Sequence, residues 1–220
     1  MSDLAGAREN MITRHLVGRG VANPHVLDAM RAVPREEFVG ADLRACAYDD
    51  GPLPIGAGQT ISQPYIVALM IEAAGVRPGA CVLEVGAGCG YAAAVMSRIA
   101  ARVHAIELHD ALAQEARARL ARLGYDNIEM RTGDGTSGWP EAAPFDAIIV
   151  SAGGPNAPEP LLSQLAVGGA LVMPVGPPSA QRLVRIARTG EAAFRTDDLG
   201  GVVFVPLVGK HGWADETMRR

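Results

Sequence analysis

The stretch CVLEVGAGCGYAAAVM, residues 81–96, decides the fold of this chain. Its first five residues are mostly apolar and typical of a buried strand, and its last six are typical of a helix. Between them stand Gly86, Gly88 and Gly90, which allow a tight turn and a close approach of the backbone to a ligand. A glycine-rich turn that joins a strand to a helix is typical of nucleotide-binding α/β folds.

Strand and helix patterns continue to alternate after this turn. Predicted strands lie at 81–85, 102–108, 127–132, 145–152 and 168–176, and predicted helices at 91–101, 110–123 and 158–166. This alternation favours right-handed crossovers and a parallel sheet. Two further predicted strands, at 181–188 and 201–208, are joined by a connection that suits antiparallel pairing. We therefore predict an α/β, Rossmann-like, doubly wound sheet that is mostly parallel, with an antiparallel C-terminal edge.

The residues before this region predict helices and one long irregular segment. The predicted helices lie at 3–19, after the cap residue Asn23, and at 64–75. The segment 39–61 is rich in glycine and proline, and its Ile and Leu residues favour a functional loop over disorder. Within one compact domain, we expect residues 1–76 to supply N-terminal helices and an active-site loop, and residues 77–220 to form a cofactor-binding core.

The composition excludes one class of partner. With 220 residues, 49% of them hydrophobic, the chain can bury the core of one domain. Its net charge is −4 and Lys210 is the only lysine, so the basic surface that duplex nucleic acid requires is missing. Three arginines cluster at Arg117, Arg119 and Arg122, and this pattern is interpreted as a solvated helix face.

The number of cysteines and the hydropathy of the chain indicate the compartment in which the protein works. Cys46, Cys81 and Cys89 are odd in number and lack a CxxC pair, which argues against a disulfide framework and a zinc site. The N-terminus is too polar for a signal peptide, and no apolar run reaches the roughly 18 residues of a membrane span. We therefore expect a cytoplasmic protein with no membrane partner and no metal.

Acidic residues follow the next two strands of the predicted sheet. Glu107 ends the strand at 102–108, where a carboxylate can accept hydrogen bonds from both hydroxyls of a ribose. Asp134 follows the strand at 127–132 and is placed to meet an adenine edge. Neighbouring parallel strands end at one edge of a sheet, so these acids and the glycine turn should face one crevice. On its own, Glu107 is equally consistent with a solvated acid.

The spacing of the glycines favours S-adenosylmethionine over a nicotinamide dinucleotide. A dinucleotide motif would place its third glycine at Tyr91, and it would bring a pyrophosphate close to Glu84. A carboxylate repels a pyrophosphate but attracts a sulfonium or an amino group. A dehydrogenase is therefore the weaker alternative.

The segment GQTISQPY, residues 58–65, carries a serine without an obvious catalytic partner. No Gly-x-Ser-x-Gly elbow surrounds Ser62, and no base is apparent that would make it an acyl-transfer nucleophile. From spacing alone, Ser62 is more simply the N-cap of the helix that begins near Pro64.

At this point the chain resembles the protein-L-isoaspartate O-methyltransferases, a family of class I S-adenosylmethionine-dependent enzymes. The most specific shared segment is GQTISQPY, whereas the glycine motif marks only the broad class. The resemblance also covers VLDAMRAVPREEFV (26–39), AYDDGPLPIGAGQTISQPYIVALM (47–70), VLEVGAGCGYAAAVM (82–96), GDG (133–135), FDAIIVSAG (145–153), LLSQLAVGGALVMPVG (161–176) and FVPLVG (204–209). The chain departs from the usual sequence of this family at two places, Cys89 in the glycine turn and SAGG at 151–154.

The resemblance implies the substrate and the role of the serine. The enzyme would transfer a methyl group from S-adenosylmethionine to the free α-carboxylate of L-isoaspartyl residues in damaged proteins. The ester then cyclises to a succinimide, which can open to normal aspartate. Ser62 would orient the carboxylate by a hydrogen bond, and no base is needed because the carboxylate is already ionised at pH 7.

The resemblance and the strand-end geometry together define the expected site. Residues expected to contact the cofactor are Gln59, Thr60, Ile61, Glu84, Gly86, Ala87, Gly88, Gly90, Tyr91, Glu107, Leu108, Asp134 and Gly135. Residues expected to contact the substrate are Ile55, Ser62, Gln63 and Val205. We expect the loop 51–62 and a strand around 203–207 to hold the main chain of isoaspartyl peptides by strand addition, in a monomeric protein.

Other interpretations are weighed against this one. The intact TISQP segment argues against a non-catalytic cofactor-binding module. A nucleic-acid methyltransferase would carry an Asn-Pro-Pro-Tyr or Pro-Cys signature where this chain has SAGG. A dedicated peptide remains an alternative to randomly damaged protein as the substrate. Asp49 and Asp50 are interpreted as structural, and His104 as packed in the core.

Overall fold

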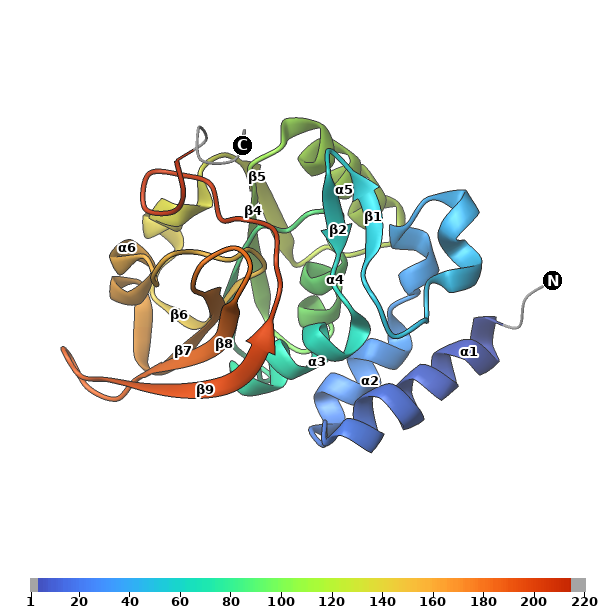
Figure 1. Cartoon of the computed structure of the whole chain (residues 1–220), viewed down its shortest axis with the longest axis horizontal. Helices are drawn as coiled ribbons and strands as arrows, with labels where there is room; N and C mark the ends of the chain where they lie inside the picture. Colours follow the sequence, from blue (N-terminus) through green and yellow to red (C-terminus); the bar gives the residue numbers. More distant parts are fainter. Residues whose placement is uncertain (1–3, 215–220) are drawn as a thin grey trace.

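A seven-stranded sheet runs through the centre of the protein, with helices on both faces (Figure 1). The structure is a computed structural model and describes residues 4–214. The strands are β3 (Cys81–Val85), β4 (Arg102–Glu107), β5 (Ile128–Thr132), β6 (Phe145–Val150), β7 (Leu165–Val175), β8 (Gln181–Arg188) and β9 (Phe194–Val202). Their order in the sheet is β5-β4-β3-β6-β7-β8-β9.

The pairing of the strands confirms the predicted architecture. Strands β5, β4, β3, β6 and β7 pair in parallel, and β8 and β9 add two antiparallel pairings at the C-terminal edge. From β3 the chain first winds towards β5 and then returns to continue with β6 on the other side. The strand order therefore reverses beside β3, and ligands of open α/β sheets bind at such a switch point.

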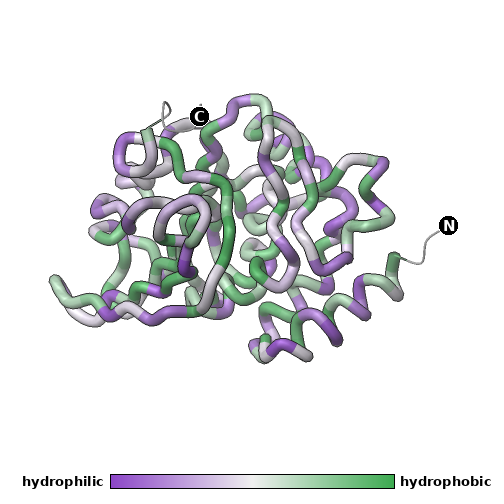
Figure 2. Tube along the Cα trace, in the orientation of Figure 1, coloured by the Kyte–Doolittle hydropathy of each residue, from purple (hydrophilic) through white to green (hydrophobic). Residues whose placement is uncertain are grey.

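The helices cover the sheet because adjacent residues of a strand point to opposite faces. In β3, Val82 belongs to one hydrophobic cluster and Leu83 to the other. The N-terminal helices and α4 (Tyr91–Ser97) pack in the cluster of Val82, and α6 (Glu159–Ser163) packs in that of Leu83. The helices are α1 (Leu4–Asn10), α2 (Pro24–Ala32), α3 (Pro64–Ala73), α4 (Tyr91–Ser97), α5 (Asp110–Arg122) and α6 (Glu159–Ser163). Figure 2 shows that α1 and α2 alternate between hydrophilic and hydrophobic residues.

The N-terminal region contains more short elements than its sequence indicates. After α1 the chain forms a π-helical turn (Met11–Leu16) and a 3-10 turn (Val17–Arg19), and Asn23 caps α2 as predicted, with its side chain accepting from His25 N at 3.0 Å. Further 3-10 turns are Arg35–Phe38, Ala41–Cys46, Gly135–Ser137 and Pro140–Ala142. The segment expected to be irregular contains a hairpin of β1 (Leu53–Gly56) and β2 (Gln59–Ile61).

The prediction of a last strand at 201–208 is wrong. The edge strand β9 covers Phe194–Val202 instead, and it follows β8 through a tight turn in which Thr189 N donates to Ala193 O at 2.8 Å. This strand escaped the sequence pattern because one side faces solvent and its residues FRTDDLGG are largely polar. After Val202 the chain leaves the sheet, and Phe204 N donates to the side chain of Gln181 at 2.7 Å.

The interpretation of the arginine cluster as a solvated face holds for the exposed Arg122 but not for Arg117 and Arg119, which are half-buried. Arg117 donates to Met130 O at 3.1 Å, Arg119 donates to Cys89 O at 3.0 Å, and Arg122 pairs with Glu37 at 2.8 Å. These side chains tie α5 to β5, to the glycine turn and to the N-terminal region. By contrast, His104 is packed as expected, between Trp139 and Phe145.

Candidate functional site

Three adjoining pockets open at the carboxyl ends of β3, β4 and β6. We call them the inner pocket, which reaches Glu84 and α3, the strand-end pocket, which reaches Glu107, and the outer groove, which reaches Arg19. Thr60 and Ser151 line all three, and Ser62 lines the inner pocket and the outer groove. The three pockets therefore meet around a group of hydroxyl side chains.

Most of the predicted site residues line these pockets. Those in the inner pocket are Ile55, Thr60, Ile61, Ser62, Glu84, Gly86, Ala87, Gly88 and Tyr91. Those in the strand-end pocket are Gln59, Thr60, Gly86, Gly88, Glu107, Leu108, Gly135 and Val205. Those in the outer groove are Thr60, Ser62, Gln63 and Val205. Gly90 and Asp134 line none of the three.

The glycine turn is shaped by left-handed backbone and by close packing. Gly88 has a φ of +54° and Gly90 a φ of +85°, a region that residues with a Cβ rarely adopt. A Cβ at Gly88 would lie 3.0 Å from Ile55 Cδ1, and one at Gly90 would lie 3.2 Å from Leu120 Cδ1. Gly88 thus lets the β1–β2 hairpin lie over the turn, whereas Gly90 lets α4 begin against α5.

The carboxylate of Glu107 holds the glycine turn in place. One oxygen accepts from Gly88 N at 2.7 Å and the other from His109 N at 2.9 Å, and the residue is only 4% exposed. The alternative of a solvated acid is therefore wrong. A carboxylate oxygen can accept more than one hydrogen bond, so the remaining lone pairs can face the strand-end pocket.

We predict that Glu107→Gln destabilises the protein and weakens cofactor binding. An amide offers one acceptor oxygen instead of two, so either Gly88 N or His109 N loses its partner, which costs about 1–3 kcal/mol. Thermal unfolding should show a lower Tm, and a titration with S-adenosylhomocysteine should show a higher Kd. The matched control is Glu115→Gln on the exposed side of α5. Equal behaviour of the two variants would contradict the role of Glu107.

Asp134 is engaged by protein groups. Its carboxylate accepts from Thr136 N at 2.8 Å, from the Thr136 hydroxyl at 2.7 Å and from Lys210 N at 2.8 Å. Burial acts to raise the pKa of Asp134, but these hydrogen bonds outweigh it and hold the pKa below its usual value. The side chain joins the end of β5 to the C-terminal segment, and its contact with an adenine edge stays a prediction.

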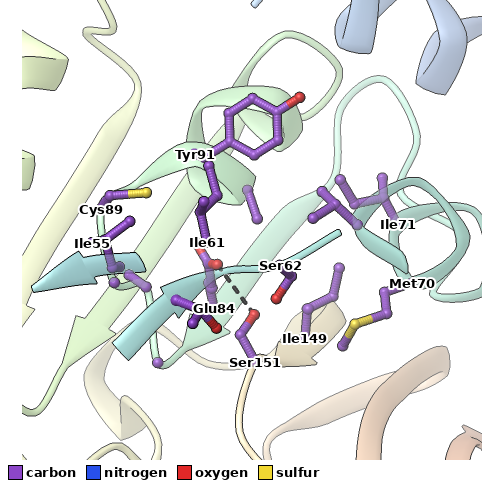
Figure 3. A pocket seen from close by; sticks show the side chains of 16 residues that line it. Ile55, Ile61, Ser62, Met70, Ile71, Glu84, Cys89, Tyr91, Ile149 and Ser151 are labelled. Atoms are coloured by element: carbon purple, nitrogen blue, oxygen red, sulfur yellow. Dashed lines mark hydrogen bonds between the residues drawn. The ribbon is translucent and has the colours of Figure 1, made fainter. Parts of the chain in front are cut away.

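Glu84 lies at the bottom of the inner pocket with one oxygen unsatisfied. Glu84 is 1% exposed, and its Oε1 accepts a long hydrogen bond of 3.5 Å from the Ser151 hydroxyl (Figure 3). Its Oε2 has no hydrogen-bond partner among the described residues. Burial, together with the nearby charge of Glu107, raises the pKa of Glu84 to about 8. A buried oxygen without a partner is costly, so this pocket suits a ligand that brings a donor or a positive charge.

Ser62 lies on the turn between β2 and α3, and its interpretation as the N-cap of α3 is wrong. The cap residue is Gln63, one position later. The carbonyl of Ser62 accepts from Arg35 Nη2 at 2.8 Å, while its hydroxyl has no hydrogen-bond partner among the residues that the structure describes. Figure 3 shows its side chain beside those of Ser151 and Ile149, in the pocket that contains Glu84. The hydroxyl is therefore available to a ligand.

The neighbours of Ser62 anchor the loop before it. Gln63 Nε2 donates to Asp50 Oδ1 at 2.8 Å, and Arg19 pairs with the same carboxylate at 3.1 Å. Asp50 is therefore structural, as expected from the sequence. The guanidinium of Arg19 also lies over the ring of Tyr65, at 3.5 Å.

Two contributors to the site were missed from the sequence. Ser151 follows β6, the parallel neighbour of β3, so its position at a strand end was a signal that could have been used. Arg35 lies 27 residues before Ser62 and gives no local signal, because only the packing of the N-terminal region against α4 brings them together. Among the helices of residues 4–214, none combines the length and the hydropathy that a membrane-spanning segment needs.

Comparison with known protein families agrees with this geometry. A family model described as protein-L-isoaspartate(D-aspartate) O-methyltransferase (PCMT) matches residues 7–212. The protein-L-isoaspartate O-methyltransferase of Methylorubrum extorquens (strain PA1) is 61% identical over 97% of this chain and 93% of the relative. That of Pelotomaculum thermopropionicum is 56% identical over 97% of this chain and 93% of the relative.

Solved structures show the same fold. One named protein-L-isoaspartate O-methyltransferase matches with a TM-score of 0.85 and 31% identity, over 93% of this chain and 67% of that chain. A Plasmodium falciparum protein, crystallised in complex with S-adenosyl-L-homocysteine, matches with a TM-score of 0.79 and 26% identity, over 91% of this chain and 98% of that chain.

Proposed function

This chain belongs to the protein-L-isoaspartate(D-aspartate) O-methyltransferase family, and on that premise we propose how its residues carry out the reaction. The enzyme transfers a methyl group from S-adenosylmethionine to the free carboxylate of L-isoaspartyl residues. The proposal rests chiefly on Ser62, whose unpaired hydroxyl lies where the inner pocket meets the outer groove.

The inner and strand-end pockets fit S-adenosylmethionine. The unsatisfied oxygen of Glu84 suits the α-amino group of the methionine part, and Glu107 suits the ribose hydroxyls. Leu108 is 42% exposed at the end of β4, where it can cover one side of the nucleoside. When bound, the cofactor supplies an electrophilic methyl group on a sulfonium. The task of the protein is then to aim an electron-rich oxygen at that methyl group.

Ser62 orients the isoaspartyl carboxylate towards the methyl group. A carboxylate with a pKa near 4 is ionised at pH 7, so no side chain has to remove a proton. The Ser62 hydroxyl donates a hydrogen bond to one oxygen of the isoaspartyl carboxylate, which leaves the other oxygen directed at the methyl group. Aligned attack at about 3–3.5 Å is the condition for an efficient displacement.

The outer groove receives the peptide. Val203 is 78% exposed, and with Val205 it follows strand β9 and lines this groove together with Pro52 and Gln63. Phe204 N, Val205 O and Leu207 N already have partners within the protein, so the main chain at Val203 is the part of this segment that we propose to bind peptides of many sequences. Adding an isoaspartyl peptide should protect residues 51–62 and 203–207 from hydrogen exchange, and protection confined to other segments would contradict this assignment.

The substrate class is tested with one peptide in two forms. We predict methyl transfer to the isoAsp form and none to the Asp form, measured as the release of volatile methanol from the ester. A dedicated peptide substrate would instead give high activity on one sequence and little on unrelated isoaspartyl peptides. Several unrelated peptides therefore belong in the same assay.

We further propose that residues 1–76 supply the serine and the peptide-binding loop, and that residues 77–220 bind the cofactor. The protein works as a monomer in the cytoplasm without a nucleic-acid or membrane partner. The net charge of −4 supports the absence of a nucleic-acid partner, and the three unpaired cysteines support a reducing compartment. Size-exclusion chromatography with light scattering tests the monomer.

A further inference from the structure

Arg35 is a fully buried cation behind the active serine. It is 0% exposed, and it forms no ion pair with any residue that the structure describes. Its Nε donates to Ala47 O at 2.7 Å and its Nη2 donates to Ser62 O at 2.8 Å. A buried charge without a carboxylate partner is costly, so its presence calls for an explanation beyond the packing of the core.

The third contact of Arg35 is with the start of α4. Its guanidinium lies 4.8 Å from the centre of the Tyr91 ring, and Tyr91 directly follows the glycine turn. One rigid, planar group therefore joins the loop at Ala47, the turn at Ser62 and the helix that begins beside the cofactor. Lysine could not reproduce this arrangement, because its ammonium is a point charge that cannot donate in two fixed directions.

The residues beside Arg35 and Ala47 are fixed as well. Arg8 Nε donates to the Tyr48 hydroxyl at 2.7 Å and Arg8 Nη2 pairs with Glu36 at 3.2 Å, while the Tyr48 hydroxyl donates to Glu36. Tyr48 follows Ala47, and Glu36 follows Arg35. Through Arg8, helix α1 therefore holds the residues next to Arg35 and Ala47, the two partners of this hydrogen bond.

We propose that Arg35 is a positioning residue for methyl transfer: it fixes the backbone of Ser62 relative to α4, and thereby sets the direction of the Ser62 hydroxyl at the isoaspartyl carboxylate. This inference rests on the proposed role of Ser62. Arg35 holds the Ser62 carbonyl, so the backbone position fixes the Cα–Cβ bond of Ser62 and with it the small set of places that the hydroxyl can reach. Because aligned attack depends on small displacements, a shift of this turn lowers kcat without touching the cofactor.

A double-mutant cycle tests the proposal. The variants are Arg35→Lys, Arg35→Met, Ser62→Ala and Ser62→Ala with Arg35→Lys. For each we would measure kcat and KM on an isoAsp peptide, and the Kd of S-adenosylhomocysteine by calorimetry. Val26→Ala is the matched control, because Val26 is fully buried in α2 and lines none of the three pockets.

The expected result is a loss in kcat that depends on the serine. Arg35→Met should lower kcat at least about 10-fold, as a 1 Å misplacement can, and Arg35→Lys should restore part of it. The Kd of S-adenosylhomocysteine should change less than about 2-fold. In the Ser62→Ala background, Arg35→Lys should have almost no further effect on kcat, since residues that act through one another are not additive.

Three outcomes would overturn the inference. The first is that Arg35→Lys lowers kcat by the same factor with and without the Ser62 hydroxyl. The second is that the Arg35 variants lose affinity for S-adenosylhomocysteine in parallel with kcat. The third is that Val26→Ala lowers kcat by as much as the Arg35 variants do. If Arg35→Met does not fold, Arg35→Lys and the double variant decide the question. Wild-type kcat in Ser62→Ala would instead contradict the proposed role of Ser62 itself, so the two failures are distinguishable.

Discussion

Ser62→Ala is expected to lower kcat/KM for an isoAsp peptide by about 10- to 150-fold. The estimate follows from the loss of one hydrogen bond to a charged group, worth about 1.5–3 kcal/mol, at about 1.4 kcal/mol for each factor of ten. The Kd of S-adenosylhomocysteine should stay within about 2-fold of the wild-type value, since the hydroxyl contributes to aligning the acceptor rather than to holding the cofactor.

Two further variants sharpen this test. Ser62→Thr retains a hydroxyl and should recover part of the activity, whereas Ser179→Ala removes an exposed hydroxyl between β7 and β8 and should leave kcat/KM unchanged. Loss of cofactor affinity in Ser62→Ala that matches the loss of kcat/KM would mean that Ser62 contributes to the cofactor site instead.

Glu84→Gln is expected to raise the Kd of S-adenosylhomocysteine by about 100-fold or more. Removing one partner of a buried ion pair costs about 3–5 kcal/mol, and the amino group of the ligand would then be buried without a counter-charge. Calorimetric titration measures the change directly. An unchanged Kd would show that the amino group is held elsewhere.

The same variant changes the pH dependence of stability. The pKa of Glu84 is raised from its ordinary value of 4.5 to about 8, so between these two values the folded protein binds one proton more than the unfolded chain. Its contribution to the free energy of unfolding is therefore present below pH 4.5 and is lost as the pH rises through 8. In the ligand-free protein, Glu84→Gln should flatten this decline, which denaturant unfolding at pH 5 and pH 8 would measure.

The affinity for the cofactor should increase as the pH rises, whereas the stability contribution of Glu84 decreases. Glu84 must lose its proton to pair with a cationic amine, so the wild-type Kd of S-adenosylhomocysteine should fall as the pH rises from 5 to 7. An α-amino group stays charged over this range, because its pKa is about 7.7–8.0. In Glu84→Gln the Kd should be nearly constant over the same range, and a slope like that of the wild type would contradict the assignment.

The order of strands and helices could be predicted because it depends on local patterns. The strand at 81–85 is recognisable from its run of apolar residues, and the turn after it from its three glycines. Both patterns lie within a few neighbouring residues. The edge strand β9 could not be predicted, since it is held by its pairing with β8 while its own residues are mostly polar. The serine segment was recognised by family resemblance, whereas its local spacing wrongly favoured a helix cap.

The chemistry of the charged residues was decided by contacts that no local pattern encodes. From the sequence, Glu84 and Glu107 are two acids near a glycine turn. Only the assembled sheet makes one a carboxyl with an unsatisfied oxygen and the other the acceptor that holds the turn. Arg35 meets Ser62 for the same reason. Periodicity and propensity act over a few residues, but burial and hydrogen bonding depend on segments that folding brings together.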